Sequence, residues 1–188
     1  MQKRYLALFD LDGTLFDTND VNYYAYKDAL ASFKIHLDKQ YFITKCNGRH
    51  YTEFLPLIMK KEGTSENIES VHKIKKDTYV KNLDKAKANK HLFQIIEAIK
   101  DIYHIAVVTT ASKQNTMDIL KYFCYDDLFE YIVTQEDISR VKPDPQGFLI
   151  AMKYFGIKAE HTVIFEDSKV GIKAARATGA TVFTVNQI

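Results

Sequence analysis

Cysteine is scarce in this chain of 188 residues, and neither a long apolar run nor an excess of one charge is present. The two cysteines, Cys46 and Cys124, lack the spacing of metal ligands, which is typical of free thiols in a reducing compartment. No apolar stretch approaches the ~18–20 residues that span a bilayer. The formal net charge of +2 is too weak to imply nucleic acid or an anionic membrane as a partner.

A secretory signal is not visible either, because the amino terminus runs straight into a short apolar segment. Together with the free thiols, this predicts a cytoplasmic location. There is no internal repeat and no low-complexity tract. With 46% hydrophobic and 27% charged residues, the composition is that of an ordinary globular protein, and the length suits one domain with a modest insertion.

Short apolar runs alternate with amphipathic segments along most of the chain. The predicted strands are Tyr5–Phe9, His104–Thr109, Tyr131–Thr134, Thr162–Phe165 and Thr181–Val185. Between several of them, apolar residues recur at helical spacing, as in the segment that contains Leu92, Ile95, Ile96 and Ile99. Strands that alternate with helices favour a parallel sheet with right-handed crossovers. The sequence therefore predicts an α/β fold with a doubly wound parallel sheet.

Residues 17–84 break this alternation and show three apolar stripes at helical spacing. We expect Gly63 to end the second of these helices and Ser65 to cap the third. The pattern predicts a helical domain inserted into a core that is formed by residues 1–16 and 85–188. Lysines gather near the end of the insertion and interleave with acidic residues, which indicates a solvated helix face; they are Lys73, Lys75, Lys76, Lys81, Lys85, Lys87 and Lys90.

Two aspartates one residue apart, Asp10 and Asp12, follow the first predicted strand, and Gly13 comes directly after them. The alternation of a strand would send both carboxylates to the same side if it continued. Glycine at position 13 allows the chain to turn and the backbone to approach a ligand closely. The alternative is a simple strand-to-turn junction, because Asp and Gly are common turn residues.

Polar side chains also follow three later strands. They are Thr110 and Ser112, Lys142, and the run Glu166, Asp167 and Ser168. Each has a purely structural alternative: the hydroxyls and Asp167 could cap helices, and Lys142 could be a surface lysine. The carboxyl ends of parallel strands, however, meet at one edge of the sheet, where such folds bind their ligands. We therefore expect these groups to form one site.

The loop that contains Lys142 has two prolines. Pro143 favours an extended backbone at Lys142, and Asp144 is expected to cap a helix with Pro145 at its first position. This predicts that Lys142 is fixed on a short, rigid segment that leads into a helix.

The charges of such a site require compensation. Two carboxylates ~4 Å apart repel by ~4 kcal/mol at an effective dielectric constant of ~20, and one lysine does not relieve several such pairs. Either some acids are protonated, or a divalent cation lies among Asp10, Asp12 and Asp167, with Glu166 nearby. A ligand set of oxygen atoms alone predicts Mg²⁺ as the cofactor.

A metal, a lysine and a hydroxyl together suit a phosphoryl group. The metal, Lys142 and Thr110 would offset charge on its nonbridging oxygens while Asp10 attacks phosphorus in line and forms an aspartyl-phosphate. Asp12 is placed to protonate the leaving oxygen and later to deprotonate the attacking water.

In that order, the four segments resemble the four motifs of the haloacid dehalogenase-like (HAD) hydrolase superfamily; they are Asp10-Leu11-Asp12-Gly13-Thr14, Thr110, Lys142 and Glu166-Asp167. The similarity extends through Gly171–Ala180. The insertion looks like the small α-helical cap of the subgroup that holds phosphoglycolate phosphatase-like enzymes and β-phosphoglucomutase.

The resemblance implies a role for each matching residue. Asp10 would be the nucleophile and Asp12 the general acid and base. Binding of the phosphoryl group would fall to Thr110, Ala111 and Lys142. The metal would be held by the Asp10 carboxylate, the Asp12 main-chain carbonyl and Asp167, with Glu166 among the ligands or just beyond them.

The chain departs from the resemblance ahead of the second motif, where many relatives have a Pro-Gly pair and this sequence has Lys85-Ala86-Lys87-Ala88. We interpret these residues as a changed helix start.

Phosphatase is the activity that the resemblance favours. Dehalogenase relatives lack an aspartate at the position of Asp12, and β-phosphoglucomutase-like sequences have His at the position of Asn22 and often Val at that of Thr14. A catalytically silent binding protein would be expected to have lost a carboxylate, and none is lost. A mutase and a silent binder remain the alternatives.

The expected substrate is a small phosphorylated metabolite, with sugar phosphates, phosphoglycolate and nucleoside monophosphates all open. The segment Thr44–His50 is expected to form a loop between the first two cap helices, where Gly48 would allow close approach to a ligand. We expect Arg49, with Lys45 or His50 as further candidates, to contact the nonreacting part of the substrate. The alternative is a solvent-exposed turn, and both a monomer and a homodimer remain open.

Overall fold

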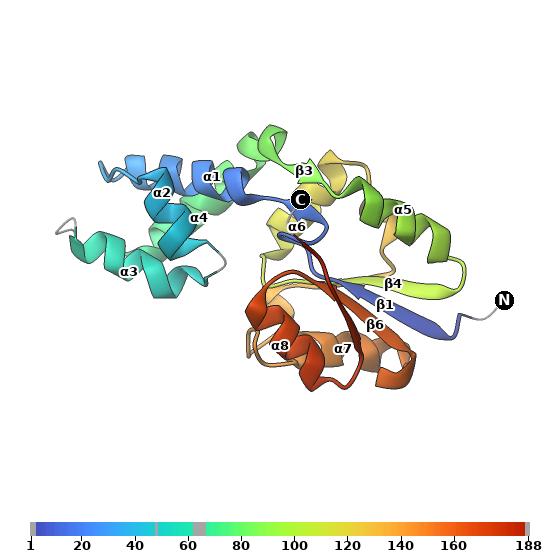
Figure 1. Ribbon diagram of the computed structural model, residues 1–188. Helices are drawn as coiled ribbons and strands as arrows, with labels where there is room; N and C mark the ends of the chain where they lie inside the picture. The colour runs from blue at the N-terminus through green and yellow to red at the C-terminus, as the bar shows by residue number, and fades with distance from the viewer. Residues whose placement is uncertain (1–2, 48, 62–66, 187–188) are drawn as a thin grey trace. The chain divides into compact units, whose positions relative to one another are not determined.

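A computed structural model describes residues 3–47, 49–61 and 67–186 of the chain (Figure 1). The chain divides into two compact units, one made of Met1–Asp17 with Lys87–Ile188 and the other of Thr18–Ala86. Each unit has its own buried apolar cluster. Gly48, Gly63 and Ser65, for which the sequence predicted roles in the insertion, lie outside the described residues.

The first unit contains a five-stranded parallel sheet. Its strands are β1 (Tyr5–Phe9), β4 (Tyr103–Val108), β5 (Tyr131–Val133), β6 (Thr162–Glu166) and β7 (Thr181–Thr184), in the spatial order β5-β4-β1-β6-β7. The central strand β1 is buried from Leu6 to Phe9, as its continuous apolar run requires in a sheet covered on both faces. The predicted α/β fold with a doubly wound parallel sheet is confirmed.

The register of this sheet decides where the polar segments meet. Phe9 at the end of β1 lies beside Val107 of β4 and Phe165 of β6. Asp10, the residues after β4 and the acids at the end of β6 therefore all lie at one edge.

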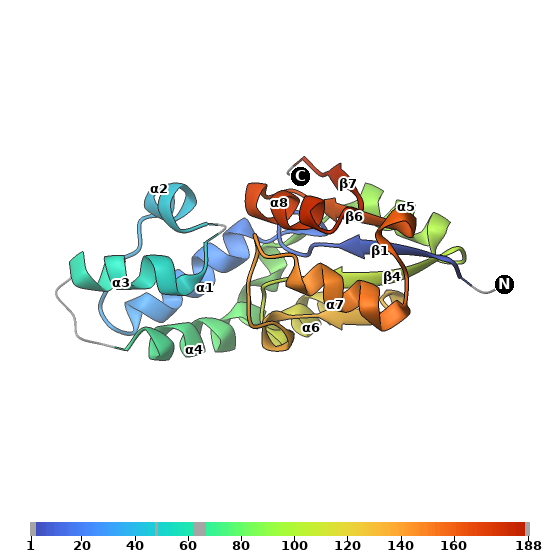
Figure 2. The same ribbon diagram turned by 90° about the horizontal axis from the view of Figure 1, so that it is seen from below.

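Four longer helices cover the two faces. They are α5 (Lys90–Ile99), α6 (Lys113–Tyr122), α7 (Gln146–Phe155) and α8 (Lys169–Ala177). Figure 1 shows α7 and α8 below the sheet and α5 above it, and Figure 2 shows α7 and α8 from below. Phe148 and Ala174 from these helices pack with Leu6 and Leu8 of β1 in a buried cluster. Short 3-10 turns complete the unit at Asp126–Leu128, Gln135–Asp137 and Ala159–His161.

The predicted helix start at Lys85–Ala88 is wrong. Lys87–Ala88 forms β3, which pairs antiparallel with β2 (Phe16–Asp17). Helix α5 begins only at Lys90, where the Asn89 side chain accepts a hydrogen bond from the Leu92 N–H at 3.1 Å. A polar N-cap such as Asn89 is enough to start a helix, so no proline is needed there. The strand β3 was not predicted because it forms only by pairing with β2, which is distant in sequence.

The second unit is helical. Its elements are α1 (Asn19–Ala31), α2 (Lys39–Tyr41), a π-helical turn η1 (Phe42–Cys46), α3 (Tyr51–Lys61), α4 (Ile68–Tyr79) and a 3-10 turn η2 (Val80–Lys85). The loop predicted at Thr44–His50 is thus partly wrong, because Thr44, Lys45 and Cys46 belong to η1. The N-cap of α4 is Asn67, whose side chain accepts from the Glu69 N–H.

The burial of Lys75 contradicts the predicted solvated helix face. Only 6% of it is exposed, because Val71, Lys75 and Tyr79 share the buried face of α4. Its ammonium lies 5.3 Å from the ring centroid of Tyr26 and 4.7 Å from that of Tyr79. Aromatic faces attract a cation, so the charge is accommodated inside the unit.

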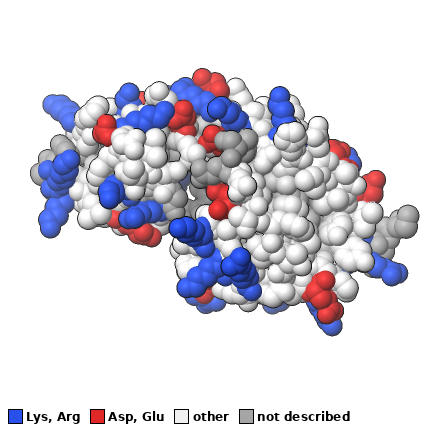
Figure 3. Space-filling view, in the orientation of Figure 1, with Lys and Arg blue, Asp and Glu red and all other residues white. Residues whose placement is uncertain are grey.

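The outer surface agrees with the nearly balanced charge of the sequence. On the face shown in Figure 3, Lys and Arg side chains lie among Asp and Glu side chains in both units. None of the helices in the described part of the chain combines the length and the apolar character that a bilayer crossing needs.

Candidate active site

Three carboxylates meet at the carboxyl edge of the parallel sheet. Asp10 follows β1, Glu166 ends β6, and Asp167 comes next. One carboxylate oxygen from each lies within 4.8 Å of the others. Glu166 is fully buried and Asp10 is 6% exposed. Like charges at this separation in a dry environment repel strongly, so the group requires positive charge.

Lys142 supplies part of that charge. Its Nζ donates to Asp10 Oδ1 at 2.5 Å, to Glu166 Oε2 at 2.6 Å and to the main-chain oxygen of Val108 at 3.3 Å. Burial by itself lowers the pKa of the Lys142 ammonium, but attraction by Asp10 and Glu166 outweighs it, so the pKa is raised. Lys142 is therefore a permanent cation here, and the predicted surface alternative does not apply.

The carboxyl groups are not fully compensated by one lysine. Burial raises the pKa of Asp10 well above its usual range, and the charge of Glu166 raises it further. The pKa of Asp167 is also raised, first by burial and then by Glu166. Burial and the charge of Glu166 thus disfavour the charged forms of both acids.

The amino terminus of α8 holds Glu166 in place. Glu166 Oε1 accepts from the N–H groups of Asp167 and Ser168, at 3.1 and 3.0 Å, and from Ser168 Oγ at 2.9 Å. The Ser168 side chain also caps α8 by accepting from the Gly171 N–H. The other carboxylate oxygen of Glu166, Oε2, accepts from Lys142.

The loop after β1 holds Asp167. Gly13 has a φ of +92°, and a side chain on it would collide with the Asp167 carboxylate. The hydroxyl of Thr14, which is fully buried, donates to Asp167 Oδ1 at 3.0 Å. Glycine is required at position 13 for both reasons, the left-handed backbone and the close approach.

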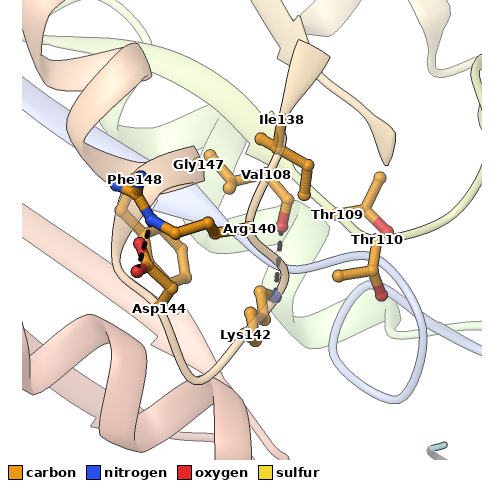
Figure 4. Close-up of a pocket in the computed structure, with 9 residues that line it drawn as sticks. All are labelled: Val108, Thr109, Thr110, Ile138, Arg140, Lys142, Asp144, Gly147 and Phe148. Carbon is orange, nitrogen blue, oxygen red and sulfur yellow. Dashed lines mark hydrogen bonds and ion pairs between the residues drawn. The ribbon is translucent and has the colours of Figure 1, made fainter. Parts of the chain in front are cut away.

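Thr110 and Lys142 both line a small pocket (Figure 4). The lining residues are Val108, Thr109, Thr110, Ile138, Arg140, Lys142, Asp144, Gly147 and Phe148. The neighbouring Ala111 N–H donates to Thr109 Oγ1 at 3.0 Å, which closes the turn after β4. Ser112, not Thr110, caps the next helix, so Thr110 is left beside the pocket.

The remaining predicted residues are placed differently. Asp12 lies half-buried in the loop after β1, and its carboxylate is not a member of the three-carboxylate group. Arg49 lies exposed in the second unit, and its N–H donates to the main-chain oxygen of Cys46. Its contact with substrate stays a prediction.

The donor set fits a hard divalent cation. Among the described residues, the acidic group that could hold a metal ion consists of Asp10, Glu166 and Asp167. All three offer oxygen, which Mg²⁺ prefers over nitrogen or sulfur ligands. The raised pKa values of Asp10 and Asp167 favour the same conclusion, because a bound cation would stabilise their charged forms.

Comparison with known families agrees with this geometry. The family model described as haloacid dehalogenase-like hydrolase matches residues 7–185, which include every residue of the site. The chain belongs to the haloacid dehalogenase-like hydrolase family.

Two of the similar proteins have phosphatase names. The phosphorylated carbohydrates phosphatase of Thermotoga maritima is 26% identical over 179 residues, which cover 92% of this chain and 81% of the relative. The fructose-1-phosphate phosphatase YqaB of Escherichia coli is 25% identical over 180 residues and covers 95% of both chains. The crystal structure of CbbY from Rhodobacter sphaeroides in complex with phosphate shares the fold, with a TM-score of 0.88, 20% identity, and coverage of 98% and 87% of the two chains.

Sequence reasoning missed the contacts by which three further residues shape the site of this hydrolase. Thr14 and Ser168 hold Asp167 and Glu166, and Gly171 makes room for Glu166, because a side chain there would collide with the carboxylate. Thr14 stands in the first motif, but a contact between residues 14 and 167 leaves no local sequence signal. Helix α7 also begins at Gln146 rather than Pro145, with Asp144 Oδ1 accepting from the Gln146 N–H.

Proposed function

We propose that this hydrolase is a Mg²⁺-dependent phosphatase that cleaves a small phosphorylated metabolite through an aspartyl-phosphate on Asp10. The observation that supports this most directly is the buried Asp10 carboxylate, which Lys142 holds beside two further carboxylates at the ligand-binding edge of the sheet. The phosphatase names of similar proteins support the same reaction class.

The metal would be held by Asp10, Asp167 and the main-chain carbonyl of Asp12, with Glu166 at or beside the ion. Bound there, Mg²⁺ would supply positive charge that offsets the charge of the phosphoryl oxygens. Glu166 already uses both oxygens, one toward Lys142 and the other toward the start of α8. Its main role in this proposal is to hold Lys142.

In the first half of the reaction, an oxygen of Asp10 forms a bond to phosphorus while the bond to the leaving oxygen breaks. Lys142 binds Oδ1 of Asp10 and so orients the carboxylate for this attack. Asp12 donates its proton to the leaving oxygen, which departs as an alcohol. The phosphoryl oxygens are bound by Lys142, by Thr110 and by the turn at Ala111.

In the second half, Asp12 takes a proton from water, and the water oxygen attacks phosphorus. The bond between Asp10 and phosphorus breaks, which releases inorganic phosphate and restores both carboxyl groups. The helical unit, which contains Arg49, would act as the cap that selects the substrate and excludes water.

The test is a screen of sugar phosphates, phosphoglycolate and nucleoside monophosphates with Mg²⁺, with phosphate release as the readout. We expect release by the wild type and none by Asp10→Asn, because the amide is not a nucleophile. Glu160→Gln is the matched control, since this exposed carboxylate precedes β6 at the end opposite Glu166. It should retain the wild-type rate.

Two other outcomes would overturn the proposal. An isomeric phosphate ester without free phosphate would identify a mutase. Complete inactivity of the wild type toward every ester would indicate a silent binding protein.

A further inference from the structure

The loop that presents Lys142 spans residues 139–145, and we call it the Lys142 loop. Four of its residues, Ser139, Arg140, Val141 and Pro143, are exposed to solvent, so apolar packing contributes little to its position. The Lys142 ammonium is nevertheless held in three hydrogen bonds deep in the site. Something else must fix the backbone of the loop.

Gln146 at the first position of α7 holds the beginning of the loop. Its Oε1 accepts from the N–H of Ser139 at 2.9 Å and from the N–H of Arg140 at 2.7 Å. Its Nε2 donates to Ser139 Oγ at 3.1 Å. One side chain therefore ties the start of the loop to the helix at its end, with Lys142 between the two.

Asp144 adds a second connection inside the same loop. Its Oδ1 accepts from the Gln146 N–H at 2.9 Å, and its Oδ2 accepts from Arg140 Nε at 2.7 Å, the contact drawn in Figure 4. Both connections include Arg140, two residues before Lys142, and both reach Gln146. Arg140 is largely exposed, so its ion pair alone contributes little. The amide of Gln146, with two main-chain donors, is the stronger restraint.

We propose that Gln146 is a positioning residue that holds the Lys142 ammonium in register with Asp10. The expected effect of Gln146 on the catalytic rate rests on the proposed phosphatase function. Its expected effect on the position of Lys142 does not. A displacement of about 1 Å in a catalytic group can cost about 100-fold in rate, so loosening this loop should be visible in turnover.

Two substitutions test whether the acceptor oxygen of Gln146, and not merely the length of its side chain, holds the loop. Gln146→Met keeps the length and removes the acceptor, whereas Gln146→Glu keeps an acceptor for Ser139 and Arg140 and suits the start of a helix. We expect kcat/KM to fall about 10-fold in Gln146→Met and to stay within about threefold of wild type in Gln146→Glu.

A readout that needs no activity is the acetylation of individual lysines by acetic anhydride, followed by mass spectrometry. We expect Lys142 to react several-fold faster in Gln146→Met than in the wild type, because its hydrogen bonds open more often. Lys153, exposed on the same helix α7, should react equally in both proteins. Gln146→Glu should protect Lys142 as the wild type does.

Unchanged Lys142 acetylation together with unchanged kcat/KM in Gln146→Met would overturn the inference. A rise shared by Lys153 would overturn it as well, because it would show general loosening instead of a local effect. If the wild type released no phosphate while Lys142 acetylation rose in Gln146→Met alone, the positioning role would stand and the phosphatase proposal would fail.

Discussion

Glu166 has no solvent exposure, and its carboxylate occupies space that exists because residue 171 has no side chain. At this residue scale, the site depends on small groups as much as on charged ones. Gly13 allows the Asp167 carboxylate to approach the backbone, and Thr14 donates a hydrogen bond to it. Each of these residues acts on a carboxylate that is distant in sequence, so its role is visible only in the fold.

Gly171→Ala should destabilise the protein and reduce its activity. The added methyl group would collide with the Glu166 carboxylate, and overpacking of this kind costs about 1–3 kcal/mol. Urea unfolding measures the loss. Lys173→Ala, on the exposed side of the same helix, should change the free energy of unfolding by about 0.5 kcal/mol or less. Equal stability of Gly171→Ala and wild type would contradict the geometry described for α8.

At the scale of elements, a second group of charged residues lies at the amino ends of the strands, opposite the candidate site. Glu130, just before β5, accepts from Lys3 Nζ and His104 Nδ1, both at 2.7 Å, and from the Ile105 N–H at 3.3 Å. It therefore connects β4 and β5 with the segment before β1. Burial by itself raises the pKa of Glu130, but the hydrogen bonds from Lys3 and His104 outweigh it and leave the pKa lowered.

Glu130→Gln should lower stability at pH 6 and matter less at pH 3. Because the pKa of Glu130 is lower in the folded state, its charge contributes stability above the unfolded value of about 4.3, and this is lost as the pH falls through the folded pKa. The side chain is partly exposed, so we expect about 1 kcal/mol or less. Urea unfolding at both pH values measures the difference. A stability loss that grew toward pH 3 would contradict this assignment.

At the scale of the whole molecule, the ionised forms of Asp10 and Asp167 are less favourable in the folded chain than in the unfolded one. The pKa values of Asp10 and Asp167 are raised by burial and by Glu166, so folding favours their protonated forms. Their contribution is therefore favourable below the unfolded pKa of about 3.9 and is lost as the pH rises through the folded values. The folded chain keeps the three carboxyl groups close together, which suits a site that binds a cation.

Mg²⁺ should consequently stabilise the protein, and Asp167→Asn should remove most of the effect. At 100 times its dissociation constant, a ligand adds about 2.7 kcal/mol, and each kcal/mol shifts Tm by about 2–4 °C for a protein of this size. Without metal, Asp167→Asn should melt above the wild type, because one repulsive charge is gone. Thermal unfolding with Mg²⁺ or with EDTA measures both effects. An equal Mg²⁺ shift in the two proteins would place the ion elsewhere.

The sequence predicted the five strands of the sheet to within one residue at each end, because each is a short apolar run followed by polar residues. It did not predict β2 and β3, which have two residues each and are defined by their pairing with each other. The burial of Lys75 was also missed, since charge counting ignores which helix face packs inward.

What the sequence determined by itself is the fold class and the order of the chemical groups along the chain, since both follow from local periodicity and from residues next to strand ends. Only the tertiary structure decided that Lys142 binds Asp10 and Glu166 together, that Thr14 holds Asp167, and that Gln146 ties the Lys142 loop. The physical reason is that hydrogen bonds and ion pairs act over about 3 Å in space, whatever the separation in sequence.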